Sequence, residues 1–260
     1  KAIRLKPDYF EAHHNLAVSY AEQGNFEEAL LSARYAKAFN PAYGPAHQIL
    51  SFALRNLGKE AEAEAAAQTA VALDRDDPDA YLALADVLVA IGRLDEGEAA
   101  LTHAIALKPS SARSYLRLAE TQRDLASYDK ALASVDKAIE INDKMPVLWA
   151  RKAQLLNFLS RSDEAWEAVK KAESMASEHP SILSAVADMY LIMNEKDKAE
   201  EYVKQAIEQN DKLPSNYFLM RSIRKFKADD PYYSKLMSMA ENIEDYDDTQ
   251  KAVIYFTLCS

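Results

Sequence analysis

Residues 10–43 read FEAHHNLAVSYAEQGNFEEALLSARYAKAFNPAY. This stretch contains two short amphipathic segments, with Gly24 between them and Pro41 near the end. Apolar and small residues recur three, four and seven positions apart in both segments, which is the spacing of one face of an α-helix. The stretch therefore predicts a helical hairpin with a glycine turn.

The same design recurs down the chain at a fixed interval of 34 residues, without insertion or deletion. A period of this kind predicts an array of stacked supersecondary units, because one hairpin cannot bury its apolar face alone. Residues 1–9 match the end of a further interval, so we expect the chain to begin inside a repeat. The predicted complete repeats are 10–43, 44–77, 78–111, 112–145, 146–179 and 180–213.

Small residues hold three positions of nearly every repeat. Small side chains let two helix axes come close, while Leu and Tyr fill the remaining gaps. We therefore expect these positions to form the helix contacts of an all-α fold. They are Ala17, Ser51, Ala85, Ala119, Ala153 and Ala187; then Ala29, Ala63, Gly97, Ala131, Ala165 and Ala199; then Ala36, Ala70, Ala104, Ala138, Ala172 and Ala206.

The turn between the two helices of a repeat carries glycine in the first three copies and another residue in the later three. A residue with positive φ is commonly required at such a turn, and glycine adopts it without steric cost. Side-chain caps are predicted at helix starts. The turn residues are Gly24, Gly58 and Gly92, then Ala126, Ser160 and Asn194, and the predicted caps are Asn25, Asp77 and Ser111.

The 34-residue period, the pattern of small and large residues, the turn glycines and the closing prolines Pro7, Pro41 and Pro109 resemble the tetratricopeptide repeat. The resemblance covers residues 1–213. It implies a right-handed superhelical solenoid of paired helices. It also implies that the first helix of each repeat lines a concave surface, where an extended peptide or a partner protein binds.

Residues 214–260 depart from the period, and we expect them to form a divergent helical cap or linker. Helices are predicted around 232–242 and from about 249, with an acidic loop at 244–248 between them. The last helix is apolar enough to need a partner, which leaves self-association through it as an option. We also expect the chain to continue beyond Ser260.

This tail is similar to the segment that joins tetratricopeptide repeats to a sulfotransferase domain in some bacterial proteins. The similarity is carried by Lys225-Phe226, Asp229-Asp230-Pro231, Met237 and Tyr255-Phe256-x-Leu258. It implies an alternative function, in which the repeats are the arm of a larger bacterial enzyme and serve substrate binding or oligomerisation. The phosphosulfate-binding loop of that family does not occur in the sequence.

Composition limits the partners. The chain of 260 residues has a net charge of −10, which gives it no generic attraction to nucleic acid. No apolar run approaches the length of a membrane span, so no membrane contact is expected. Cys259 is the single cysteine, which excludes an intrachain disulfide and fits a reducing, cytoplasmic setting.

Motifs for chemistry are missing from the sequence. There is no phosphate-binding loop, no nucleophile elbow and no zinc-protease motif. His13 and His47 occupy the aromatic core position of their repeats, so we interpret them as packed rings. We expect no enzyme activity in this chain, no cofactor and no metal.

Binding on the first helices is the expected function, with a protein or peptide as the partner. The positions that the resemblance places on the concave face carry mixed charge, which suits a charge-complementary extended peptide. A clamp for a carboxyl terminus, built from Lys and Asn one turn apart, is excluded by the residue pairs present, and so is an asparagine ladder. The predicted binding residues are His14, Gln48, Arg55, Asn56, Asp86, Arg113, Arg117, Glu120, Arg123, Arg151, Gln154, Asn157 and Asp188.

Overall fold

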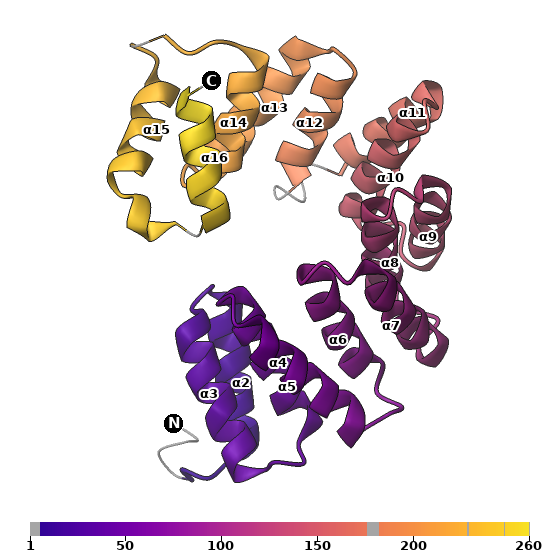
Figure 1. Cartoon of the computed structure of the whole chain (residues 1–260). Helices are drawn as coiled ribbons and strands as arrows, with labels where there is room; N and C mark the ends of the chain where they lie inside the picture. The colour runs from indigo at the N-terminus through magenta and orange to yellow at the C-terminus, as the bar shows by residue number, and fades with distance from the viewer. Residues whose placement is uncertain (1–5, 176–181, 228, 247, 260) are drawn as a thin grey trace. The chain divides into compact units, whose positions relative to one another are not determined.

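The computed structural model describes residues 6–175, 182–227, 229–246 and 248–259 (Figure 1). Within these ranges all regular structure is helical, and there is no strand. The fold is thus the all-α array of helix pairs that the sequence predicts. Part of the expected repeat end at 1–9, and the expected boundary between 179 and 180, lie outside the described residues.

The chain forms two compact units, Lys1–Ile141 and Asn142–Ser260. The described part of the first unit consists of successive helical hairpins. They are α2 (Phe10–Glu22) with α3 (Phe26–Phe39), α4 (Gly44–Asn56) with α5 (Glu60–Leu73), α6 (Pro78–Ala90) with α7 (Leu94–Leu107), and α8 (Ala112–Asp124) with α9 (Tyr128–Ile141).

The second unit begins with the same design and ends differently. It contains the hairpins α10 (Pro146–Phe158) with α11 (Ser162–Glu173) and α12 (Leu183–Ile192) with α13 (Lys196–Gln209). These are followed by α14 (Pro214–Ile223), α15 (Pro231–Glu241), the short 3₁₀ helix η2 (Ile243–Asp245) and α16 (Asp248–Cys259). The six 34-residue repeats and the 213/214 boundary between array and cap remain our proposal for how the chain is divided.

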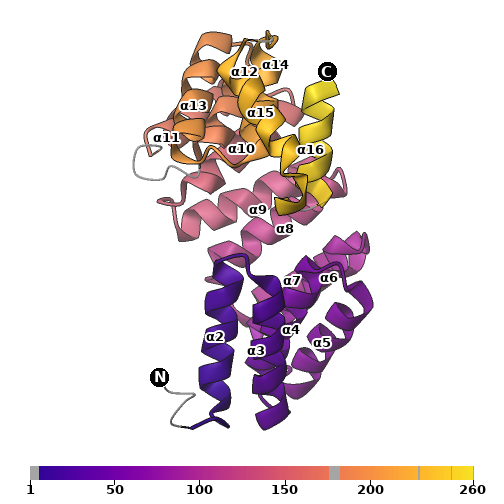
Figure 2. The same ribbon diagram turned by 90° about the vertical axis from the view of Figure 1, so that its left-hand side faces the viewer.

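Stacking follows one rule inside each unit. The two helices of a hairpin pack on each other, and the second helix packs on the first helix of the next hairpin, as α3 does on α4 and α13 does on α14. First helices also touch in sequence, α2 with α4 and α4 with α6 in the first unit, and α10 with α12 in the second (Figures 1 and 2). The first helices of a unit therefore share one face, and the second helices share another.

The small residues predicted for the helix contacts are all buried. Ala36, Ala70, Ala104 and Ala138 are 0% exposed. Their side chains leave room for the facing helix axis, which is the reason the array tolerates so little variation there. His13 and His47 are buried as well, at 8% and 3% exposure, and each ring hydrogen-bonds a backbone carbonyl six residues earlier, at 2.8 and 2.9 Å.

The turn inside each hairpin has one backbone geometry in all six copies. Gly24, Gly58 and Gly92 have φ of +76°, +69° and +80°, and Ala126, Ser160 and Asn194 have φ of +55°, +56° and +62°. In each turn the N–H of the following residue donates to a carbonyl five residues before it, for example Asn25 to Tyr20 at 2.9 Å. The packing of the two helices requires this turn. The later repeats therefore adopt a positive φ at residues with a β-carbon, for which that conformation is sterically unfavourable.

Two of the three predicted helix caps form. The side chain of Asp77 accepts a hydrogen bond from the N–H of Asp79, and that of Ser111 accepts one from Ser114. The prediction for Asn25 is wrong, because its side chain makes no cap hydrogen bond. Its ψ of 74° is close to the 64° of Lys59 and the 65° of Arg93, which start the second helices of the next repeats. The preceding turn sets the backbone there, so a capping side chain has no influence.

The last helices close the second unit with their own apolar core. Tyr217, Met220, Leu236 and Ile254 are at most 1% exposed and pack in one cluster. The Arg224 guanidinium donates to the Asp230 carboxylate at 2.5 Å, and Asp230 also caps α15. Helices α15 and α16 begin close to the places that the sequence predicts.

Candidate functional site

A groove of about 300 Å³ runs over the first helices of the first unit. Every residue that lines it lies in one of the four first helices α2, α4, α6 and α8. The lining residues are His14, Val18, Pro45, Gln48, Ile49, Ser51, Phe52, Arg55, Asp79, Leu82, Ala83, Asp86, Val87 and Arg113.

The floor of the groove is apolar. Leu82 and Val87 on α6 are 5% and 0% exposed, and Ile49 on α4 packs against the core beneath. The Phe52 ring is held edge-on against Phe26, with the ring centroids 6.1 Å apart. A floor of this kind gains free energy when a ligand's apolar side chain displaces water from it.

Arg55 stands over this floor without an acidic partner. Its guanidinium carbon lies 5.2 Å from the centroid of the Phe52 ring. Among the described residues no carboxylate lies within ion-pair distance of it. Burial lowers the pKa of Arg55, an effect that the charge of Asp86 opposes and that of Arg117 reinforces. The cation is therefore partly desolvated and incompletely compensated.

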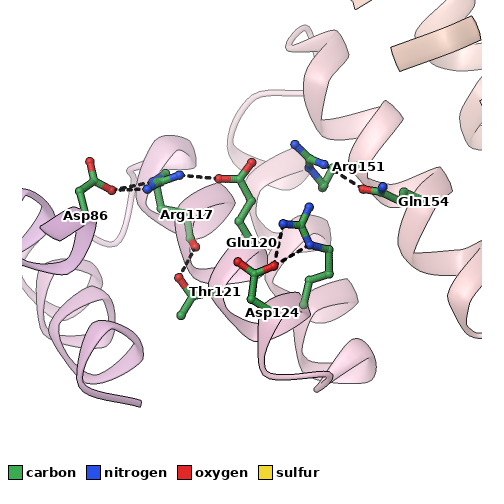
Figure 3. Close-up of polar contacts among 8 residues, drawn as sticks. Asp86, Arg117, Glu120, Thr121, Asp124, Arg151 and Gln154 are labelled. Atoms are coloured by element: carbon green, nitrogen blue, oxygen red, sulfur yellow. Dashed lines mark hydrogen bonds and ion pairs between the residues drawn. The ribbon is translucent and has the colours of Figure 1, made fainter. Parts of the chain in front are cut away.

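The positive charge of Arg117 is balanced by two carboxylates (Figure 3). It lies between Asp86 and Glu120, with nitrogen–oxygen distances of 2.6 and 2.7 Å. Burial lowers the pKa of Arg117, but the charges and hydrogen bonds of the two carboxylates outweigh burial and raise it overall. This network ties α6 to α8, so we interpret Arg117 as part of the groove's framework.

His14 contributes a neutral ring to the groove. Burial lowers the pKa of His14 below its ordinary value, so the uncharged imidazole is the form present at neutral pH. The ring meets Tyr43 edge-on at a centroid distance of 5.4 Å. Its Nδ1 is buried and has no hydrogen-bond partner within the described structure. A ligand that offers a hydrogen bond to Nδ1 would satisfy it.

The predicted residues of the second unit lie around α10 and α12. Arg151 donates to the Gln154 side chain at 2.8 Å (Figure 3). Both residues border a small hollow of about 70 Å³ together with Asp188. Burial raises the pKa of Asp188, which has no hydrogen bond or ion pair in the described part of the chain. Asn157 borders a different hollow, with Trp166 of α11.

The structure thus separates the predicted binding residues into groups. His14, Gln48, Arg55, Asp86 and Arg113 line the groove of the first unit. Arg123 pairs with Asp124 at 2.7 Å, and Asn56 donates to the carbonyl of Phe52 in its own helix. The binding role of all the predicted residues stays a prediction.

Sequence reasoning missed the apolar part of the groove. Val18, Ile49, Leu82 and Ala83 line it, yet none of them is among the predicted residues. A helix pattern does not distinguish an apolar side chain under a neighbouring helix from one at the bottom of a groove, so the predicted binding residues are mainly polar.

Within the described residues no group of three or more His, Cys, Asp or Glu side chains is arranged to hold a metal ion. No helix there combines the length and apolarity required to cross a membrane.

Comparison with protein families agrees with this architecture. Three models, each described as a tetratricopeptide repeat, match residues 54–113, residues 1–30, and residues 112–145 with 180–212. Together these matches cover more than half of the sequence. The chain belongs to the tetratricopeptide repeat family. Membership of this family supports a general role for the chain as a protein-interaction scaffold.

Solved structures share the fold at low sequence identity. A tetratricopeptide repeat protein from Parabacteroides merdae is 16% identical, with a TM-score of 0.67 over 96% of this chain and 98% of that chain. PilF from Pseudomonas aeruginosa is 19% identical, with a TM-score of 0.63 over 78% and 92%. YrrB, described as a tetratricopeptide repeat protein with an unusual peptide-binding site, is 17% identical, with a TM-score of 0.50 over 69% and 92%. No curated protein matches the sequence.

Proposed function

We propose that this chain is a non-catalytic interaction scaffold that binds an extended segment of a partner protein in the groove of its first unit. The observation that carries the proposal is the lining of that groove, which comes from four successive first helices and combines an apolar floor with charged rims. Peptide grooves commonly use apolar pockets for affinity and a few polar groups for orientation.

The volume of the groove is sufficient for one or two side chains of a bound peptide. About 300 Å³ is at the lower end of the range for small-molecule sites, and the groove is open along the row of helices. An extended peptide can place one side chain on the floor while its backbone continues over α4 and α6. YrrB, which shares the fold, is described as having a peptide-binding site, and this is consistent with the proposal.

A selection experiment tests the proposal. Short random peptides are selected on the intact chain, and the dissociation constants of the selected peptides are measured by fluorescence anisotropy. Phe52→Asp places a charge on the apolar floor, so we expect it to weaken binding by about tenfold or more. Leu31→Asp is the matched control, because Leu31 is 55% exposed on the second helix α3 of the same unit.

Binding that is lost in Phe52→Asp and kept in Leu31→Asp supports the groove as the binding surface. Equal binding by the intact chain and both variants would refute it. Circular dichroism spectra of each variant establish that the helices are intact. Charge reversal of Arg117 is a poorer test, because it breaks the pairs with Asp86 and Glu120.

A second proposal concerns the tail. Tyr255 and Phe256 on α16 are 51% and 63% exposed, and Phe256 lies 5.9 Å from Phe218 between ring centroids. Such an apolar surface suits either self-association or contact with a further domain. With the sulfotransferase-like residues of the tail, it supports the alternative of a repeat arm in a larger enzyme. The coding sequence after Ser260 decides this alternative, since the absence of a phosphosulfate-binding loop there would refute it.

A further inference from the structure

We infer that the groove of the first unit selects peptides in which an Asp or Glu side chain lies next to a large apolar side chain, and that Arg55 receives the carboxylate. This inference rests on the proposed function, because it specifies the ligand of the same groove. It follows from a cation that has no acidic partner among the described residues, in a protein with a net charge of −10.

The first argument is the environment of Arg55. The guanidinium is stacked over Phe52, half-buried, and outside ion-pair distance of every carboxylate in the described structure. The carboxylate of Asp86, which contributes most to its electrostatic compensation, is already bound by Arg117 at 2.6 Å. A desolvated guanidinium with free donors binds a carboxylate strongly, since charge-assisted hydrogen bonds are about twice as strong as neutral ones.

The second argument is an internal comparison. Arg123 occupies in α8 the position that Arg55 occupies in α4, two repeats earlier. The next residue is Asp124, whose carboxylate accepts two hydrogen bonds from Arg123, at 2.7 and 3.0 Å. The residue after Arg55 is Asn56, whose amide donates to the Phe52 carbonyl at 2.8 Å. The charge of Arg123 is thus neutralised within its own helix, whereas the charge of Arg55 faces the groove.

The third argument concerns the rest of the ligand. Phe52, Ile49 and Leu82 form the floor beside Arg55, so a large apolar side chain adjacent to the acidic one fits there. Arg113 lines the same groove, is exposed, and has no carboxylate partner in the part of the chain that the structure describes, so it adds a second cation at the α8 end. Asp79 is the one carboxylate of the lining that no arginine binds, and it is exposed at the start of α6.

The position of Arg55 favours a side-chain carboxylate over a chain end. The groove extends from His14 on α2 to Arg113 on α8, and Arg55 lies on α4 between them. A peptide that follows the groove passes Arg55 with its interior. The carboxylate that meets Arg55 then comes from Asp or Glu within the peptide.

The test uses the selected peptides with both ends blocked, so that only side chains supply carboxylates. Each acidic peptide is compared with its Glu→Gln or Asp→Asn analogue on four forms of the chain: intact, Arg55→Gln, Asn56→Asp and Arg123→Gln. On the intact chain we expect the acidic peptide to bind about tenfold more tightly than its analogue, as one charge-assisted hydrogen bond provides. We expect the preference to weaken as salt concentration rises.

The variants give the sign of the effect. Arg55→Gln removes the guanidinium that receives the carboxylate, so the acidic peptide and its amide analogue should bind about equally. Asn56→Asp places a carboxylate beside Arg55, as Asp124 stands beside Arg123, and should remove the preference while Arg55 is still present. Arg123→Gln is the matched control and should keep the preference, because its charge is already neutralised. Circular dichroism of all four forms checks that the helices are retained.

The outcomes separate the two proposals. Peptides that depend on Phe52 but show no acidic preference, or that keep it in Arg55→Gln, would overturn this inference and leave the proposed groove intact. Peptides that ignore Phe52→Asp would remove the groove as the binding surface and this inference with it. Peptides that bind before their carboxyl terminus is blocked and no longer bind afterwards would also overturn it.

Discussion

Replacing Gly97 by alanine tests the packing that the repeat depends on. The corresponding residue is alanine in the other five repeats, so sequence comparison alone recommends the substitution. Gly97 lies in α7, where alanine is favoured over glycine by about 1 kcal/mol in a helix interior. The structure predicts the opposite result. A β-carbon on Gly97 would stand 2.7 Å from the Cγ2 of Val89 on α6.

The magnitude follows from the stiffness of Val89. A β-branched side chain in a helix has one strongly preferred rotamer, so it does not turn away at low cost. Overpacking of this kind costs about 1–3 kcal/mol. Subtracting the helix preference of alanine leaves Gly97→Ala destabilising by about 1 kcal/mol.

A double-mutant cycle separates the two effects. Val89→Ala removes the clashing methyl group, so in that background Gly97→Ala should stabilise by up to about 1 kcal/mol, the helix preference of alanine. Urea unfolding followed by circular dichroism gives the four free energies. The control is Ala65→Ser at an exposed position of α5, which should change the free energy of unfolding by no more than about 0.5 kcal/mol. If Gly97→Ala stabilises the chain with Val89 present, the packing argument is wrong.

Three further predictions use the same unfolding assay. Ala138→Leu, at a fully buried helix contact, should overpack and cost about 1–3 kcal/mol, and an unchanged melting temperature would show that the assigned repeat phase is wrong. Ala126→Gly should stabilise by about 1 kcal/mol, because Ala126 holds a φ of +55°, while Gly58→Ala should destabilise by a similar amount in open space; effects of the opposite sign would contradict the account of the turn. Asp188→Asn should stabilise at neutral pH: burial raises the pKa of Asp188 above its ordinary 3.8, so its contribution to stability is present below that pH and lost as pH rises through the folded-state pKa. The difference between Asp188→Asn and the intact chain should therefore grow from acid to neutral pH, and a difference that is independent of pH would refute the assignment.

The regular part of the fold was predictable because each signal is local and repeated. Small residues at fixed intervals predict close helix contacts, and the structure buries all of them. The turn was predictable for the same reason, down to its positive φ at Gly24, Gly58 and Gly92. The cap at Asn25 was not, because the backbone there is set by the turn before it and not by the side chain's own preference.

The candidate site was predictable in part. The repeat phase places residues on the first helices, and in the structure His14, Gln48 and Arg55 line one groove. It does not tell which charges are neutralised, because a pair such as Arg117–Asp86 joins side chains of different helices. Arg117 and Arg55 look alike in the sequence, yet the first lies between two carboxylates and the second lies over a phenylalanine ring.

The sequence by itself determined that this protein is an all-α array with a 34-residue period, since many weak positions agree in phase. Only the tertiary structure decided that Val18, Ile49 and Leu82 form the floor of a groove and that Arg55 stands above it, unpaired with any described carboxylate. The physical reason is one of distance. Periodicity can be recognised from residues that are close in the sequence, whereas the burial and desolvation of a side chain depend on residues of neighbouring helices.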